Sequence, residues 1–495
     1  MLNKSHLNAI NSLQNKTIRQ FVSTFDGLKT KFMVDSNDHH LDQLSDVNIH
    51  LRQSVIDYIT EEKVMVSPQL IQSLVSGGLI SLDLWRLCQT NSFTTTHIMK
   101  IMETIAQNSH CFDSLSLGGN EWIFNTRVIR GPLKKIFDSR LNQLTTLRMQ
   151  QFSNGDDMLS ALKSCVRLKR LEICLPCVTD RDIDRIEERL KNCESVPHIK
   201  ELLLPSSFKS RALMKMLAIF CNTKTLKCTQ FEQLMDLIEV SLKSNFKSVS
   251  ELATKAKQTL NSLTSLTVVH PMSYNSIDRL VSLCPRLKSL GIELQKGMEL
   301  SPINRLNDIR ELQLRNSPSA PIQWGPQVLP ILESRGKLLS ALSLEHFDVI
   351  DLTTCAKLCP NLLHFSAQWF TILGYIRPNM PSSLRDRNLK PFSNVTHMRL
   401  RPLSGRNIPS DACAFSLSNA KQVTHIELYC CYDLSDRDVQ ALQTKNPMTH
   451  LRSLILRHGH KVTKEALNLL VSRADKLSYI DCGIPLKKED LAPDP

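Results

Sequence analysis

The sequence predicts an α/β solenoid in which a curved parallel sheet lies inside, helices lie outside, and an all-α cap precedes the first strand. Three observations carry this prediction. One six-residue apolar pattern recurs along most of the chain, helical segments separate its copies, and residues 1–75 contain no copy. Such an array can grow to 495 residues because each unit packs mainly on its neighbours.

The recurring pattern has the form L-x-x-L-x-L, in which Ile, Val, Met or Phe can replace Leu. Clear copies begin at Leu79, Phe112, Leu144, Leu168, Ile199, Leu263, Leu287, Ile309, Leu339, Val395, Val423 and Leu451. Weaker copies begin at Thr223, Leu362 and Leu477. These make about 15 units with a mean spacing of about 28 residues, which lies in the range of leucine-rich repeats.

A helix is expected to complete each unit. After the copy at Val423, Ser435 or Asp436 can cap a helix whose apolar residues lie three apart. Each helix is joined to the next strand by a short motif such as 284–287 (CPRL), in which Pro ends the helix. These phrases and the V/L-S/T-D-R-D helix start resemble the cysteine-containing class of leucine-rich repeats over about 79–485. The resemblance implies the role for which that class is best known, substrate recruitment in ubiquitin ligases.

Three regions of different organisation follow from the spacing. We expect an N-terminal helical cap at residues 1–75, the repeat domain at 76–485 and a disordered tail at 486–495. A helical insertion is expected near 229–262, where 230–260 has the pattern of one continuous amphipathic helix. The Pro-containing stretch 369–394 predicts an excursion loop.

The N-terminal segment permits two interpretations. Helices expected at about 7–32 and 47–62, and from Ser67-Pro68 onward, can cap the open end of the array. In addition, Ser12-Leu13-x-x-x-Thr17-x-x-x-Phe21 resembles the elongin-binding box of the Zyg-type and Zer-type receptors of cullin ligases. Thr17 stands where that box usually has Cys. The resemblance implies that Leu13, Thr17 and Phe21 dock an elongin- or Skp-type adaptor and, through it, a cullin. No F-box is recognisable.

Strand geometry predicts which side chains can bind a partner. Side chains alternate along a strand, so the third, fifth and seventh residues of each copy face the hollow side. Over the last third of the array these residues are Arg315, His364, Gln368, His397, Arg399, Arg401, His425, Glu427, Tyr429 and Arg457. Glu311 belongs to the same copy of the pattern as Arg315. Arginine pairs bidentately with carboxylate or phosphate, so this patch predicts a protein partner with an acidic or phosphorylated segment. The alternative is an ordinary mixed-charge groove.

Composition narrows the class of protein. The net charge of +13 favours acidic partners, and nucleic acid stays open as one of them. The first residues have no apolar core of a signal peptide, and no stretch has the roughly 18 apolar residues of a membrane span. The 15 cysteines are an odd number without a secretory signal, so free thiols are expected. We therefore expect a cytoplasmic or nuclear protein with no membrane partner.

No motif in the chain predicts catalysis. The sequence has no P-loop, GxGxxG, HExxH or GxSxG motif, so we expect no enzyme, cofactor or catalytic residue. Cys174-x-x-Cys177 with Cys193 and His198 has zinc-like spacing, but repeat register separates these residues, so no metal is expected. The sequence therefore predicts a protein-interaction scaffold, specifically a substrate-recognition subunit of a cullin-type ubiquitin ligase. The alternative is a non-ligase leucine-rich-repeat protein, whether an inhibitor, a cytoskeletal or an RNA-associated scaffold.

Overall fold

The computed structural model describes residues 47–481 with short gaps at 62, 119–129, 140, 151–154, 175–179, 192–196, 205–208, 274, 296–297, 318–323, 375–389, 460, 475 and 478. Contacts divide the chain into two compact units, Met1–Ser262 and Leu263–Pro495, and each is described by itself. The predicted docking residues Leu13, Thr17 and Phe21 and the tail 486–495 lie outside the described residues.

Each predicted copy of the pattern forms a strand that begins two residues after the copy starts. In the first unit, parallel neighbours follow chain order through β1 (Ser81–Asp83), β2 (Ser114–Leu117), β3 (Thr146–Gln150), β4 (Arg170–Cys174), β5 (Glu201–Leu204) and β6 (Thr225–Cys228). In the second unit they are β7 (Ser265–Val268), β8 (Ser289–Leu294), β9 (Glu311–Asn316), β10 (Ala341–Glu345), β12 (His364–Phe370), β14 (His397–Pro402), β15 (His425–Tyr429), β16 (Ser453–Arg457) and β17 (Tyr479–Asp481). A separate pair joins β11 (Val349–Asp351) to β13 (Ile372–Gly374).

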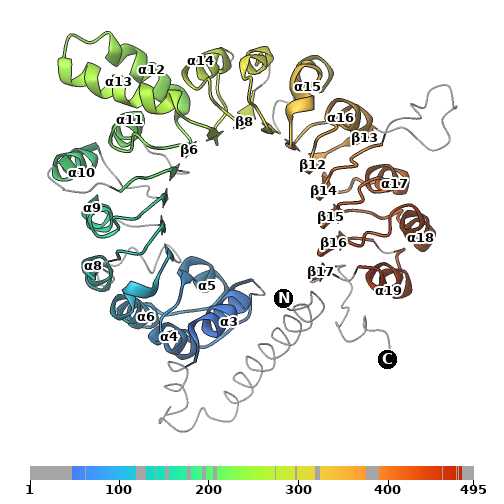
Figure 1. The fold of residues 1–495 in the computed structure, drawn as a ribbon, viewed down its shortest axis with the longest axis horizontal. Coiled ribbons are helices and arrows are strands. Elements are labelled where there is room, and N and C mark those ends of the chain that lie inside the picture. Colours follow the sequence, from blue (N-terminus) through green and yellow to red (C-terminus); the bar gives the residue numbers. More distant parts are fainter. Residues whose placement is uncertain are drawn as a thin grey trace, which may run out of the picture. The chain divides into compact units, whose positions relative to one another are not determined.

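Helices cover one face of the strands within each unit (Figure 1). Those of the first unit are α3 (Ile49–Glu61), α4 (Pro68–Ser76), α5 (Leu84–Thr90), α6 (Thr95–Gln107), α8 (Arg130–Asp138), α9 (Gly155–Ser164), α10 (Asp180–Lys191), α11 (Ser210–Ile219), α12 (Phe231–Leu242) and α13 (Lys247–Asn261). Those of the second are α14 (Ser276–Leu283), α15 (Leu329–Arg335), α16 (Leu352–Leu358), α17 (Ser410–Leu417), α18 (Asp436–Lys445) and α19 (Lys464–Ser472). The predicted leucine-rich-repeat solenoid is confirmed.

The core lies between the sheet and the helices. Pattern leucines such as Leu312 and Leu314 are 2% and 0% exposed, and burial of each side chain contributes about 1.5–3 kcal/mol. The cysteines that join a helix to the next strand are buried as well, as at Cys165 and Cys284. Burial raises the pKa of the Cys165 thiol to about 12, so this thiol stays protonated at neutral pH and serves packing.

Helix α3 closes the free edge of β1. The side-chain oxygen of Gln53 accepts hydrogen bonds from the backbone N–H groups of Ile80 (3.0 Å) and Ser81 (2.9 Å). Arg52 donates to the carbonyl of Gly78 at 3.1 Å. An edge strand otherwise leaves such groups without partners. The predicted all-α cap is therefore confirmed for α3 and α4; α4 begins with Pro68 in its first turn as expected, and the Ser67 side chain caps it.

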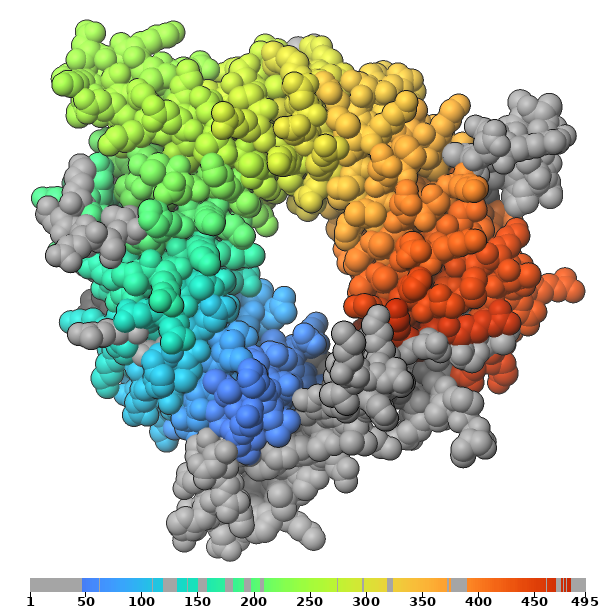
Figure 2. All heavy atoms as spheres, in the orientation of Figure 1, coloured from blue at the N-terminus to red at the C-terminus, as the bar shows by residue number. Residues whose placement is uncertain are grey.

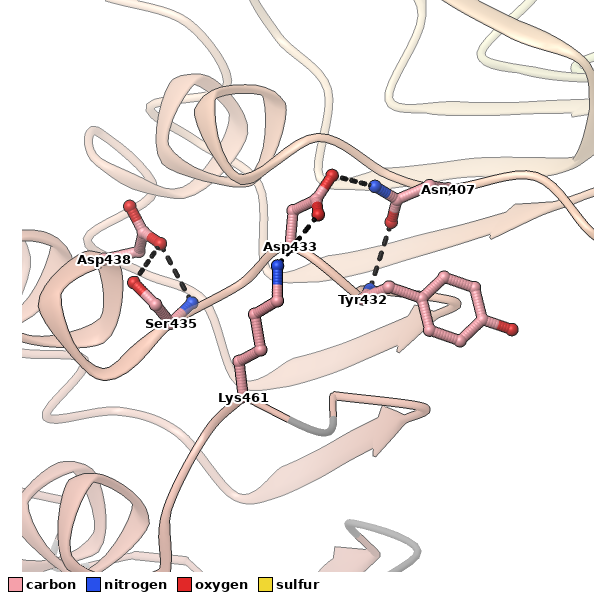
Figure 3. Close-up of polar contacts among 6 residues, drawn as sticks. All are labelled: Asn407, Tyr432, Asp433, Ser435, Asp438 and Lys461. Atoms are coloured by element: carbon pink, nitrogen blue, oxygen red, sulfur yellow. Dashed lines mark hydrogen bonds and ion pairs between the residues drawn. The ribbon is translucent and has the colours of Figure 1, made fainter.

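The turns between strands and helices are held by polar side chains. Ser435 is the N-cap residue of α18, and its N–H and hydroxyl both donate to Asp438, at 2.9 and 2.6 Å (Figure 3). The sequence left Ser435 and Asp436 open as caps, and the structure selects Ser435. Ser435 and Asp438 mark the start of this helix in the sequence itself, because the acceptor three residues into the helix satisfies a backbone donor that would otherwise be unpaired.

Side chains also link the turns of successive repeats. Asp433, after β15, accepts from Asn407 of the previous turn and pairs with Lys461 of the next one at 3.2 Å (Figure 3). Asn407 in turn accepts from the backbone N–H of Tyr432 at 3.0 Å. The turns of three neighbouring repeats are therefore fixed relative to one another, which makes the sheet beside them a rigid surface.

Two sequence expectations were wrong in detail. The segment 230–260 is two helices rather than one. Helix α12 ends at Leu242 and α13 begins at Lys247, and between them the Ser244 hydroxyl accepts a hydrogen bond from the N–H of Phe246. The green atoms of this segment form a projection in Figure 2. The expected excursion loop 369–394 begins later than predicted, since β12 and β13 occupy most of its first residues; 375–389 lie outside the described residues.

Candidate functional site

The strands of the second unit leave one sheet face uncovered by helices. Along this face a groove of about 360 Å³ runs from β7 to β15. Small side chains line the groove on two strands, Ser289 and Gly291 on β8 and Ala341 and Ser343 on β10, with Glu311 and Gln313 of β9 between them. Gly291 is closely packed, since a Cβ there would lie 3.2 Å from the Thr267 side chain, which would have to shift slightly. The groove therefore has a shallow floor with larger polar residues toward β12, β14 and β15.

Three of the predicted arginines are paired with carboxylates of a neighbouring strand. Arg315 Nε lies 2.7 Å from Glu345, a residue only 4% exposed that also accepts from the Gln313 side-chain amide at 2.9 Å. Arg399 makes a bidentate pair with Glu427, with two N···O distances of 2.6 Å.

Arg457 pairs with Asp481 of β17 through a single nitrogen, Nη2. A carboxylate partner already occupies donors that an incoming anion would need. These arginines therefore hold adjacent strands together, which opposes the sequence expectation that each of them is open to a partner.

Arg401 differs from the other three arginines. Its guanidinium carbon lies 5.3 Å from the ring centre of Trp369 and 5.0 Å from that of Tyr429. Trp369 is itself stacked on His346, with ring centres 4.7 Å apart. No carboxylate of the described residues is within ion-pair distance of Arg401. The two aromatic rings cover the faces of the guanidinium, so its in-plane N–H donors are left for an anion.

Three predicted histidines form a stacked ladder. His364, His397 and His425 occupy equivalent positions on β12, β14 and β15. The ring centres of His364 and His397 are 4.3 Å apart, and those of His397 and His425 are 4.2 Å apart. Burial and the neighbouring histidines lower the pKa of His397 to about 4, and burial also lowers the pKa of His425. Both rings are therefore neutral at pH 7.

Threonine hydroxyls orient two of these rings. The hydroxyl oxygen of Thr396 lies 3.0 Å from the carbonyl of Leu363 and 2.9 Å from His397 Nδ1. Thr424 holds His425 in the same way, at 2.8 Å from its Nδ1. The Nε2 atoms lie at the far ends of both rings.

Gln368 was predicted to face a partner, but in the structure its side chain is buried. It is 8% exposed and donates to the hydroxyl of Ser366, next to a register irregularity between β12 and β14. The residues that the sequence reasoning missed are Trp369, Glu345 and Asp481. Glu345 has the same position in its strand as Arg315, so comparing neighbouring copies of the pattern would have found it, whereas Asp481 lies opposite Ile455, two positions before Arg457.

The charge of this face is balanced rather than basic. Its described cations are Arg315, Arg399, Arg401 and Arg457, and its described anions are Glu293, Glu311, Glu345, Glu427 and Asp481. The net charge of +13 of the chain is therefore located elsewhere. An acidic partner would be drawn to the one arginine without a carboxylate, Arg401, and not to the face as a whole.

The remaining candidate chemistry is separate from this face. The side chains of Cys174, Cys177 and Cys193 lie outside the described residues, while His198 contacts Asn222 at 2.9 Å. Within the described ranges no group of three or more His, Cys, Asp or Glu side chains is placed to hold a metal. Among the helices that the structure describes, none has the length and apolar character needed to span a membrane.

The fold and its open sheet face define a leucine-rich-repeat protein. A scan against protein-family models found no match, and a search of curated proteins found none. A similar solved structure is an internalin from Listeria monocytogenes, with 12% identity, a TM-score of 0.33, and coverage of 84% of this chain and 89% of that one.

Two further solved structures are similar to this chain. The leucine-rich repeat-containing protein LegL7 from Legionella pneumophila has 16% identity, a TM-score of 0.34, and coverage of 55% of this chain and 86% of that one. A chain of the Rad7 and Elc1 complex in yeast has 13% identity, a TM-score of 0.44, and coverage of 95% and 97%.

Proposed function

We propose that this protein is an interaction scaffold whose uncovered sheet face in the second unit binds an acidic or phosphorylated segment of another protein. The observation that carries the proposal is Arg401, held between Trp369 and Tyr429 without a carboxylate partner among the described residues. A hydrogen bond to a charged group contributes about 1.5–3 kcal/mol. One well-placed carboxylate or phosphate at this position would therefore contribute roughly ten- to a hundredfold to affinity.

The finer role that we propose is substrate recognition in a cullin-type ubiquitin ligase. Its support is the resemblance of the repeats to the cysteine-containing class and of Leu13, Thr17 and Phe21 to an elongin-binding box. In this role the N-terminal helix docks an elongin- or Skp-type adaptor, and the sheet face holds the substrate. A catalytic site of its own is not part of the proposal.

Quantitative affinity capture tests both levels of the proposal. The tagged full-length protein is compared with Arg401→Glu, with Arg406→Glu as the matched control, because Arg406 is exposed in the turn after β14. Partners that use the face should be depleted at least tenfold by Arg401→Glu and retained by Arg406→Glu. If both variants retain every partner, the face is not the binding site.

The ligase role is tested in the same experiment by the adaptors. An elongin- or Skp-type adaptor and a cullin should co-purify with the full-length protein and with Arg401→Glu, but not after deletion of residues 1–40. If partners of the face are found without any adaptor or cullin, the protein is a non-ligase scaffold, which was the alternative reading of the sequence.

A further inference from the structure

The histidine ladder ends abruptly at β10. The residues at the equivalent position on β12, β14 and β15 are His364, His397 and His425, but β10 has Ala341 there and β9 has Glu311. One face of the His364 ring packs on His397, and the other is turned toward the strand that carries Ala341. The row of rings therefore lacks one member, at the centre of the groove.

The space above Ala341 fits a flat group. Neighbouring strands lie about 4.8 Å apart, so a planar group over Ala341 would stack on His364 at nearly the spacing of the ladder itself. The alanine side chain ends at Cβ, and Ser343 and Ser366 keep the adjoining floor low. Together these residues line a slot between His364 and Glu311.

The chemistry of the slot selects a cation. Glu311 is exposed, and no cation of the described residues is within ion-pair distance of it. The other charged residues that line the groove, Arg399 and Glu427, neutralise each other. His397 and His425 are neutral at pH 7, since their pKa values are lowered. Among the described charged residues that line the groove, Glu311 is therefore the carboxylate without an ion-pair partner, and it lies beside the open face of the ladder.

We propose that the slot above Ala341, between His364 and Glu311, binds an arginine side chain of the partner protein. The guanidinium is a flat cation that stacks on aromatic rings and pairs with carboxylates through its edge, whereas the lysine ammonium has no plane to stack. A nucleobase is also flat, but its phosphates would approach Glu311 and Glu427. The inference rests on the proposed function, because it names the group by which the same partner is anchored.

The slot and Arg401 together define the spacing of the bound segment. They are two strand spacings apart across the sheet and four residues apart along a strand, which corresponds to roughly 16 Å. An extended chain covers this distance in about five residues. The partner segment should therefore have an arginine and an acidic or phosphorylated residue about five positions apart.

A displayed library of random dodecapeptides tests the slot with the full-length protein. Ala341→Phe fills the slot with a ring that extends the ladder and removes no charged group. Ser453→Phe is the matched control, because Ser453 occupies the equivalent position beyond the other end of the ladder, next to His425. We expect the unchanged protein and Ser453→Phe to enrich peptides that contain arginine, and Ala341→Phe to lose this enrichment.

Binding of one enriched peptide, measured by fluorescence anisotropy, adds a second test. Replacing its arginine by lysine or by citrulline should raise Kd by roughly tenfold or more. With Glu311→Gln the arginine and citrulline peptides should bind equally well. Enriched peptides without arginine that still depend on Arg401 would overturn the arginine slot and leave the proposed function standing. If no peptide is enriched from this library or from a synthetic library that contains phosphoserine, both fall, and binding of poly(A) RNA that Ala341→Phe removes would assign the slot to a nucleobase instead.

Discussion

Arg399 and Glu427 face each other across β14 and β15, and reversing the charge of Arg399 measures what this pair contributes to the sheet. In Arg399→Glu, two carboxylates replace a pair whose N···O distances are 2.6 Å. Loss of an exposed pair costs up to about 1 kcal/mol, and like charges on opposed strand positions cost a similar amount again. The side chains are 44% and 23% exposed, so solvent screens both effects. We expect the free energy of unfolding to fall by about 1–2 kcal/mol.

Urea unfolding followed by circular dichroism tests this value with a double-mutant cycle. Arg399→Glu and Glu427→Arg should each be destabilised, whereas the double variant, which restores an opposite-charge pair, should return close to the original stability. Arg406→Glu controls for the change in net charge. The reasoning is refuted if the single variants lie within about 0.3 kcal/mol of the unchanged protein, or if the double variant shows the sum of the two losses.

Three further predictions concern the cap, the histidine ladder and the thiols. Gln53→Leu should cost about 1–3 kcal/mol, because the N–H groups of Ile80 and Ser81 lose their acceptor, and hydrogen exchange at these two amides should quicken while exchange in β16 stays unchanged. The folded protein lowers the pKa of His397 from 6.5 to about 4, so its neutral form contributes stability that is present above pH 6.5 and is lost as the pH falls toward 4. His397→Gln should flatten that part of a plot of unfolding free energy against pH, and an unchanged slope would contradict the assignment. Cys221→Ser should lower the number of rapidly labelled thiols by one, because Cys221 is exposed while the other cysteines that the structure describes are buried or half-buried; an unchanged count would contradict its exposure.

The repeat architecture could be predicted because its signal is local and is repeated many times. A leucine at fixed positions of each strand must be buried, and every copy of the pattern reports the same requirement. The weak copies at Thr223, Leu362 and Leu477 form strands as the strong ones do, since their neighbours supply the sheet edge on which they pair. The break between α12 and α13 was missed because helical periodicity continues through it, while the hydrogen bond at Ser244 that ends the helix leaves no periodic signal.

Strand alternation predicts which side chains occupy the sheet-face positions of each strand, but not what each side chain contacts. Strand alternation identified Arg399, Arg401 and Arg457 equally well. Their difference arises from the neighbouring strand, which offers Glu427 to Arg399 and Asp481 to Arg457, but an aromatic ring to Arg401. A single copy of the pattern does not contain this information, because it depends on the register between copies. The same register brings the three histidines into contact and leaves Ala341 beside them.

Site-specific photo-cross-linking in cells tests most directly whether the uncovered sheet face of the second unit holds a partner protein. Benzoylphenylalanine placed at Ser343, on the floor of the groove, should form covalent adducts with a partner. The same residue placed at Lys357, exposed on α16 in the helical layer, should form none with that partner. Adducts at Lys357 and none at Ser343 would show that the helices bind the partner and would contradict this account.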